Sequence, residues 1–421
     1  MARKTVWLLI GAAAVVLVSG SAAAQMLTSK EELGKSIFFD DNLSINANQS
    51  CATCHAPEVG WTGPLEVINA HGSVYEGSIA GRFGDRKPPS SAYATVSPIF
   101  YLDKKGLWVG GNFWDGRATG EVLGNPAADQ ARGPFLNPVE QALPDAACVV
   151  YRVCTAVGYP VSFEEVWGEE ACAIAWPGNT DALCAGGSEI PLSDSDRAKS
   201  DMAYGNIALS IAAYEDSYES NAFTSKWDAA RGNEEGVLSD EERRGFALFQ
   251  GKGKCKLCHP TSGQGALFTD FTYDNLGVPK NPENPIYLVN PGFVDEGLGA
   301  FLRNAGYDEE VYGPELGKVK VPTLRNVDKR PTPGFVKTFG HNGYFKTLKG
   351  IVHFYNTRDV LPECPGDYTE AQALAADCWP PPEVADNVNT DELGNLGLTD
   401  DEEDAIVEFL KTLSDGYAPE E

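Results

Sequence analysis

The sequence predicts a mainly α-helical protein of two similar domains, with long loops and few strands. The spacing Cys-x-x-Cys-His occurs twice, at Cys51–His55 and Cys255–His259. The stretches before the two copies, SKEELGKSIFF from Ser29 and SDEERRGFALF from Ser239, both place Glu three residues after Ser, as in a helix capping box. With 44 Gly and 27 Pro among 421 residues, much of the chain must be loop.

Helix signals recur in the same order in both halves. The two stretches carry a phenylalanine at the same offset from the serine, Phe39 and Phe249. Near the end, Thr399 and Glu402 repeat the capping pattern, and four apolar residues then fall on one helical face: Ile406, Phe409, Leu410 and Leu413. The polar run RGNEEG, residues 231–236, is the expected linker. We therefore expect domains at residues 25–230 and 237–421.

The two Cys-x-x-Cys-His units have a specific chemical interpretation. A zinc site needs four ligands from one neighbourhood, and a thioredoxin-like motif needs a βαβ context. Neither explains a histidine directly after the second thiol in both copies, whereas covalent haem attachment does. The sequence thus predicts two cytochrome-c-like domains, each with one covalent c-type haem, attached through Cys51 and Cys54 or Cys255 and Cys258, with His55 and His259 as iron ligands.

The first residues and the charge bear on location and partners. Residues 1–24 have the basic, apolar and small-residue regions of a cleaved signal peptide, with an uncleaved anchor as the alternative. No later stretch has transmembrane length, so we expect export to the periplasm with no membrane span in the mature chain. A net charge of −27 argues against nucleic acid as a partner and favours basic electron carriers, or serves only solubility.

Six further cysteines remain, an even number that suits disulfides in an exported protein. Their spacing suggests the pairs Cys148–Cys154, Cys172–Cys184 and Cys364–Cys378. Of these pairs, only the last is isolated enough in the sequence to be predicted with a defined partner. All six are interpreted as staples of long loops.

The far side of each iron is less well defined by the sequence. After the signal peptide only Met26 and Met202 remain, and neither lies in the second domain. The haem-ligating methionine of a simple electron carrier is therefore scarce. Candidates near the second haem are His341, His353 and Tyr355.

Several ordered motifs resemble those of a known family, the bacterial di-haem cytochrome c peroxidases and their MauG-type relatives. Besides the two Cys-x-x-Cys-His units, the resemblance rests on four stretches: FWDGRA (113–118), DQARGPFLNPVEQ (129–141), VPTLRNV (321–327) and HNGYFKTL (341–348). It runs from about Leu27 to Leu413. Residues 145–190 and 359–390 look like insertions.

The resemblance implies roles around the first haem. Glu140 matches the family's catalytic glutamate, and one carboxyl near its pKa in a dry pocket can both accept and return a proton. Gln130 and Pro134 match other positions of that pocket. Trp114 matches the indole that links the two haems, with filling of the domain interface as the alternative role.

The resemblance also bears on the iron ligands. Tyr355 stands where the usual peroxidases have a ligating methionine, and the MauG type implies a tyrosine ligand, which stabilises Fe(III). A core aromatic is the alternative, with His353 as the next ligand candidate. His71 lies in a loop from which some family members close the first iron, and the alternative is a histidine that never meets iron. Arg325 pairs with a haem propionate or with a protein carboxylate.

A calcium ion between the domains stays an open expectation. The resemblance implies that the asparagine ligand of this ion corresponds to a position in GDRKPPSS, where the chain has Lys87. The family's Thr-x-Pro stretch corresponds to PTPG, Pro331–Gly334. Both stretches depart from the family pattern.

The sequence therefore predicts a periplasmic di-haem enzyme that reduces hydrogen peroxide to water with electrons from a reduced cytochrome c or copper protein. One alternative is a MauG-like enzyme that oxidatively modifies a partner protein. Another is a non-catalytic electron carrier, which requires strong ligands on both faces of both irons.

Overall fold

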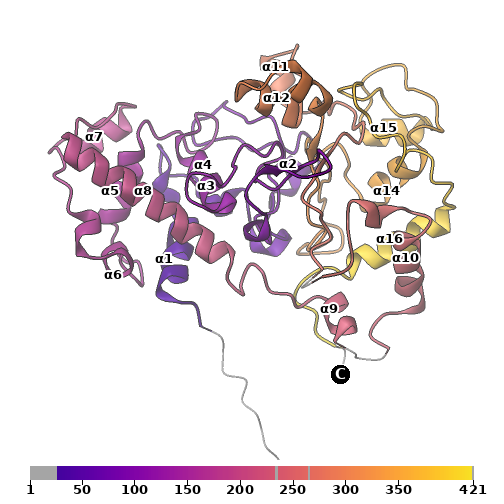
Figure 1. Ribbon diagram of the computed structural model, residues 1–421, viewed down its shortest axis with the longest axis horizontal. Helices are drawn as coiled ribbons and strands as arrows, with labels where there is room; N and C mark the ends of the chain where they lie inside the picture. Colours follow the sequence, from indigo (N-terminus) through magenta and orange to yellow (C-terminus); the bar gives the residue numbers. More distant parts are fainter. Residues whose placement is uncertain (1–25, 233–235, 264–265, 420–421) are drawn as a thin grey trace, which may run out of the picture.

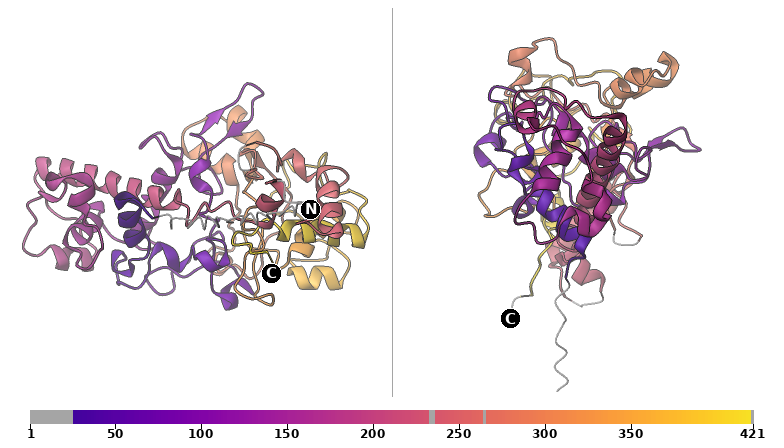
Figure 2. Two further views of the ribbon diagram at one scale, coloured as in Figure 1. Left: turned by 90° about the horizontal axis from the view of Figure 1, so that it is seen from below. Right: turned by 90° about the vertical axis from the view of Figure 1, so that its left-hand side faces the viewer.

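Helices gather at the two ends of an elongated molecule, and long loops fill the middle (Figures 1 and 2). The computed structural model describes residues 26–232, 236–263 and 266–419. The expected signal peptide lies outside these ranges. Within them, no helix is both long enough and apolar enough to cross a membrane.

Helix is the main secondary structure of the described residues. The α-helices are α1 Ser29–Phe38, α2 Glu66–Asn69, α3 Pro126–Ala131, α4 Gly133–Leu136, α5 Ala146–Thr155, α6 Phe163–Trp167, α7 Thr180–Ala185, α8 Asp194–Glu215, α9 Lys226–Arg231, α10 Asp240–Gln250, α11 Ile286–Val289, α12 Gly297–Asn304, α13 Glu309–Tyr312, α14 Leu348–Thr357, α15 Glu370–Ala375 and α16 Asp400–Lys411. The 3-10 helices are η1 Asp41–Leu43, η2 Cys51–Thr53, η3 Pro57–Val59, η4 Ala94–Val96, η5 Glu169–Cys172, η6 Cys255–Leu257 and η7 Gly313–Glu315.

Strands are few, as expected. β1 (Tyr101–Leu102) pairs antiparallel with β2 (Trp108–Val109), and β3 (Tyr273–Asp274) with β4 (Val319–Lys320). These short pairs hold loops together and do not form a layer of the fold.

Each end of the molecule contains the same helix crossing. α1 packs against α8, and α10 packs against α16. A Cβ atom built on Gly34 of α1 would lie 1.9 Å from the carbonyl oxygen of Ser210, and one built on Gly245 of α10 would lie 1.8 Å from that of Ala405. Glycine at each crossing lets the two helix backbones touch, so the helix pairs of the two halves pack in the same way.

The capping boxes show which residues of the two halves correspond to each other. Those of Ser239 with Glu242 and of Thr399 with Glu402 are confirmed. The box expected from Ser29 is wrong by one residue, because Thr28 with Glu31 caps α1. The residue equivalent to the buried Phe249 is consequently Phe38, also buried, whereas Phe39 is 41% exposed.

Two hydrophobic clusters form the cores. The first is built mainly on α1, α5 and α8, and the second on α10, α14 and α16. Trp227 of α9 is buried in the second cluster. The chain has therefore left the first cluster before α9, earlier than the expected linker at 231–236, of which residues 233–235 lie outside the described ranges.

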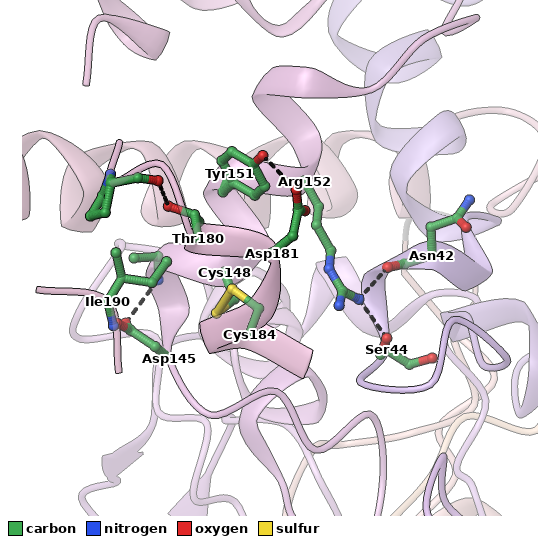
Figure 3. Close-up of a disulfide and its surroundings, with 12 residues drawn as sticks. Asn42, Ser44, Asp145, Cys148, Tyr151, Arg152, Thr180, Asp181, Cys184 and Ile190 are labelled. Atoms are coloured by element: carbon green, nitrogen blue, oxygen red, sulfur yellow. Dashed lines mark hydrogen bonds between the residues drawn. A yellow bond between two sulfur atoms is a disulfide. The ribbon is translucent and has the colours of Figure 1, made fainter. Parts of the chain in front are cut away.

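Three disulfides are present, but two of the expected pairs are wrong. The bonds join Cys148 to Cys184, Cys154 to Cys172 and Cys364 to Cys378. The first two connect helix α5 to α7 and to η5 within residues 145–190. Figure 3 shows the first bond beside Asp145, which accepts a hydrogen bond from the Ile190 backbone N–H at 2.9 Å. Cys148 and Cys154 lie on one helix but bond to different cysteines, which the spacing in the sequence alone does not reveal.

Replacing Gly245 by Ala tests the backbone contact at the crossing. In an open helix this change stabilises, but here the new methyl group meets the Ala405 carbonyl, so we expect a loss of about 1–3 kcal/mol. Gly178, with open space around it, provides the control for the same substitution. Thermal unfolding of both variants measures the difference, and an unchanged melting temperature for Gly245→Ala would contradict the crossing.

Candidate active site

A cavity of about 430 Å³ lies between the two clusters and is lined by residues of both. It brings together the predicted site residues except His71 and the alternative ligand His353. The predicted residues that line it are Cys51, Cys54, His55, Trp114, Gln130, Pro134, Glu140, Cys255, Cys258, His259, Arg325 and Tyr355.

The first Cys-x-x-Cys-His unit is a compact turn. Cys51 begins η2, and the backbone N–H of His55 donates to the Cys51 carbonyl at 3.0 Å. The His55 Nδ1 atom lies 3.2 Å from the Trp61 carbonyl oxygen. Burial lowers the pKa of His55 to about 4. The ring is therefore neutral at pH 7, and a proton on Nδ1 would leave Nε2 as a metal ligand.

The second unit repeats this arrangement. Cys255 begins η6, and the backbone N–H of His259 donates to the Cys255 carbonyl at 2.9 Å. The His259 Nδ1 atom lies 2.7 Å from the Phe268 carbonyl oxygen, and burial lowers the pKa of this histidine as well. Both histidines thus have one ring nitrogen occupied and the other available.

The donor set of the cavity fits two haems. Its four thiols are unpaired, while the other six cysteines form disulfides. Burial raises the pKa of Cys54 and Cys255 to about 12, so these thiols are protonated and poorly suited to bind a bare metal ion. Two thiols beside a neutral imidazole, present twice around one cavity, suit thioether attachment and axial ligation.

Around the first unit the cavity wall is built from α3, α4 and the loop that follows. Gln130 belongs to α3 and Pro134 to α4. Glu140 accepts a hydrogen bond from the Asn137 side-chain amide at 3.1 Å. Burial raises the pKa of Glu140, and the nearby Arg117 charge opposes this shift. A carboxyl so placed can exchange protons closer to neutral pH than an exposed one.

Trp114 lies where the two halves meet. Its indole N–H donates to the Lys87 carbonyl at 2.9 Å, and the Lys87 backbone N–H donates to the His341 carbonyl at 2.9 Å. The rings of Trp114 and His341 are 6.4 Å apart, edge to face. Arg86 joins Asp115, next to Trp114, to Asp295 of the other half at 2.7 and 2.6 Å. The indole is thus held in a fixed position in the wall of the cavity that both Cys-x-x-Cys-His units line.

Helix α14 brings Tyr355 to the second unit. Burial raises the pKa of Tyr355, and the nearest thiols, Cys258 and Cys255, add to the shift. His353, the other ligand candidate on this helix, does not line the cavity, because its Nδ1 atom binds Glu403 of α16 at 3.0 Å. Two residues apart on a helix, the side chains of His353 and Tyr355 project in different directions.

Residues 359–390, which were expected to be an insertion, hold α14 at both ends. The Trp379 indole N–H donates to the Thr357 hydroxyl at the end of the helix, at 3.0 Å. At its start, Glu370 accepts from the Lys346 backbone N–H at 2.6 Å. Glu370 lies within the loop closed by Cys364–Cys378. The position of Tyr355 therefore depends on this insertion.

Two predicted residues have other surroundings in the structure. The His71 side chain is 67% exposed, and its Nδ1 atom lies 3.1 Å from Glu283. Arg325 is buried and binds the carboxylate of Asp228 through two hydrogen bonds of 2.9 and 2.8 Å. Arg325 therefore has a protein carboxylate as a partner and also lines the cavity, and its contact with a haem propionate stays a prediction.

The methionines of the described chain do not reach the cavity. Met26 is 84% exposed, and Met202 is 71% exposed. Among the residues that the structure describes, no methionine is therefore in a position to bind an iron at either Cys-x-x-Cys-His unit.

Sequence reasoning missed several charged residues of the cavity wall. Glu215 and Lys337 are buried, Lys320 is half-buried, and all three line the cavity. The Glu215 Oε2 atom has no hydrogen-bond partner among the described residues, and burial raises the pKa of Glu215 to about 8. For Glu215, the signal available in the sequence was a charged residue at a position on the apolar face of helix α8.

Comparison with known proteins agrees with this site. A family model described as di-haem cytochrome c peroxidase matches residues 28–236. The methylamine utilization protein MauG of Paracoccus denitrificans is 34% identical over 390 residues, 91% of this chain and 88% of that protein. The cytochrome-c peroxidase IdrP1 of Denitromonas iodatirespirans is 26% identical, over 92% of this chain and 82% of its own length.

A solved structure is also similar. The di-haem peroxidase BthA of Burkholderia thailandensis superposes with a TM-score of 0.69 and 28% identity, covering 94% of this chain and 88% of that one. The chain belongs to the di-haem cytochrome c peroxidase family. It is an oxidoreductase of the peroxidase type with haem as its cofactor.

The buried Glu215 predicts a pH dependence of stability. Its folded pKa is raised above the unfolded value, so its protonated form stabilises the fold fully below about pH 4.5, and this contribution is lost as pH rises through about 8. Glu215→Gln stays neutral throughout. Its melting temperature should match the wild type at pH 5 and exceed it at pH 9. The exposed Glu189→Gln is the control, and equal melting temperatures for wild type and Glu215→Gln at pH 9 would refute the assignment.

Proposed function

We propose that the chain is a periplasmic enzyme with two covalent c-type haems that reduces hydrogen peroxide to water, using electrons from a small redox protein. The observation that carries this proposal is Glu140, a carboxyl with a raised pKa in the wall of the cavity that holds the first Cys-x-x-Cys-His unit. The four free thiols would attach the haems, and His55 and His259 would bind the irons.

We further propose one haem domain on each side of the cavity. The first would comprise the chain before α9, and the second would begin with α9, because Trp227 packs in the second cluster. The repeated helix crossing at Gly34 and Gly245 supports two domains of one type.

When bound, haem supplies the redox-active iron through which electrons pass to the substrate. The reduction of one peroxide molecule to two waters consumes two electrons and two protons. Glu140 would accept a proton from one peroxide oxygen and return it to the other, which leaves as water. Asn137 orients the carboxyl, and Gln130 and Pro134 limit the space in which peroxide turns.

Trp114 would connect the two haem sites electronically. Its ring is held by the hydrogen bond to the Lys87 carbonyl and contacts His341 of the other half. A buried indole in a fixed position between the two sites suits stepwise electron transfer. Electrons would enter at the second site, where Leu257 between the two thiols is 48% exposed.

A MauG-like role is the second candidate, and Tyr355 favours it. A phenolate ligand stabilises oxidised iron, whereas methionine favours the reduced form. An enzyme that withdraws electrons from a partner protein needs such stabilisation. In either role the net charge of −27 favours a partner with a basic surface.

Glu140→Gln tests the proposed function. The amide keeps the size of the side chain but cannot carry the proton, so peroxide turnover should fall about 100-fold or more while both haems are retained. Turnover is measured with reduced cytochrome c, and in parallel with candidate protein substrates. The exposed Glu121→Gln is the matched control.

The outcomes separate the candidates. Loss of turnover with cytochrome c supports the peroxidase, and loss of oxidation of a protein substrate alone supports the MauG-like role. Full turnover by Glu140→Gln would exclude the proposed proton transfer. A wild-type protein inert toward peroxide in every redox state would point to a non-catalytic electron carrier.

A further inference from the structure

Two buried lysines lie in the cavity wall where the halves meet. Lys87 is 9% exposed, and its ammonium group donates to the Thr62 hydroxyl at 3.0 Å and the Pro88 carbonyl at 3.2 Å. Lys337 is 4% exposed. Its ammonium group donates to three backbone carbonyls, of Val59, Asn326 and Lys329, at 2.8, 2.7 and 3.0 Å.

Neither ammonium group forms an ion pair with a carboxylate among the described residues. This is unusual, because buried charges are generally paired with an opposite charge. Arg86, in the same wall, follows that rule, because it forms ion pairs with Asp115 and Asp295. Lys87 and Lys337 are instead surrounded by uncharged oxygen atoms, the environment that proteins commonly give to a bound cation.

The two lysines link the halves of the molecule. Lys337, from the second half, binds the Val59 carbonyl of the first. The Lys87 backbone connects the Trp114 indole to the His341 carbonyl. The charge of Lys87 contributes, after burial, to lowering the pKa of Lys337.

Calcium does not fit this junction. A calcium site needs six to eight oxygen ligands, usually with carboxylates among them. The oxygens here already accept hydrogen bonds from ammonium groups, and the lysine charges would repel a divalent ion. The other expected stretch, Pro331–Gly334, is exposed and does not line the cavity.

We propose that the ammonium groups of Lys87 and Lys337 take the place of a metal ion at the junction between the two halves, so that this protein holds its active conformation without calcium. The cation is then part of the chain and cannot be removed by a chelator. Burial lowers the pKa of both lysines, that of Lys87 only to about 8, so Lys87 is mostly charged at neutral pH. The three carbonyls around Lys337 match the three N–H groups of an ammonium, because a neutral amine has only two.

Metal content provides the first test. The haem-loaded protein is passed through gel filtration in buffer with EGTA, and calcium is measured by mass spectrometry. Visible spectrum and thermal unfolding are then compared with and without added calcium chloride. We expect no stoichiometric calcium and no change in either measurement. One calcium ion retained per chain, or a spectral change with EGTA that calcium reverses, would overturn the proposal.

Two substitutions provide the second test. Lys87→Met and Lys337→Met should lower the melting temperature and alter the visible spectrum, and added calcium should not restore either. Lys346→Met is the control, because this partly buried lysine also joins the halves, through Ser73 and Gly343, but does not line the cavity.

Wild-type behaviour in both Lys87→Met and Lys337→Met would refute the proposal. If these variants do not fold, Lys87→Arg, which keeps the charge, should fold and remain insensitive to EGTA, and a dependence on calcium would count against the proposal. Metal content and unfolding do not depend on turnover, so they remain informative even if the proposed peroxidase activity is absent.

Discussion

The arrangement of this protein depends on one constraint: two Cys-x-x-Cys-His units from different halves of the chain must face the same cavity. The helix crossings at Gly34 and Gly245 set the orientation of each half. Ion pairs and buried ammonium groups between the halves then fix their separation. Trp114 is held by this junction, which explains why so many charged side chains are buried in its surroundings.

The two ends of the cavity are alike on one side and different on the other. Both histidines are neutral, with Nδ1 beside a backbone carbonyl. In addition, the first end presents a carboxyl on a loop, which can exchange protons, and the second presents a phenol on a helix held at both ends. This asymmetry suits one site for substrate chemistry and one for storing and passing electrons.

The sequence was most informative where chemistry demands specific residues at fixed spacing. The Cys-x-x-Cys-His units and the Glu140 stretch needed no structure to be singled out, and the structure brings them together. Local patterns were ambiguous where two residues fit equally well. Thr28 and Ser29 both precede a glutamate by three residues, and only the structure, through the Thr28–Glu31 hydrogen bonds and the burial of Phe38, distinguishes them. Cysteine spacing likewise could not reveal which helix each thiol faces.

Long-range contacts were beyond sequence reasoning. Arg325 binds Asp228, almost a hundred residues away, and the charge of Lys87 acts on Lys337 across the junction. Nothing in the sequence near Lys337 marks it as a buried cation, because its partners are backbone carbonyls, which every residue possesses. Residues 359–390 were predicted to be an insertion, but their contacts with α14 depend on Trp379 and Glu370, which only the fold brings to this helix.

The most direct test of the difference between the two ends of the cavity uses the oxidised, haem-loaded Tyr355→Phe variant. Its visible and electron paramagnetic resonance spectra are compared with those of the wild type. His353→Gln, a change on the same helix outside the cavity, is the control. A phenol that binds the second iron predicts altered spectra for Tyr355→Phe and wild-type spectra for His353→Gln. Spectra of Tyr355→Phe identical to wild type would show that the second end is not defined by this tyrosine.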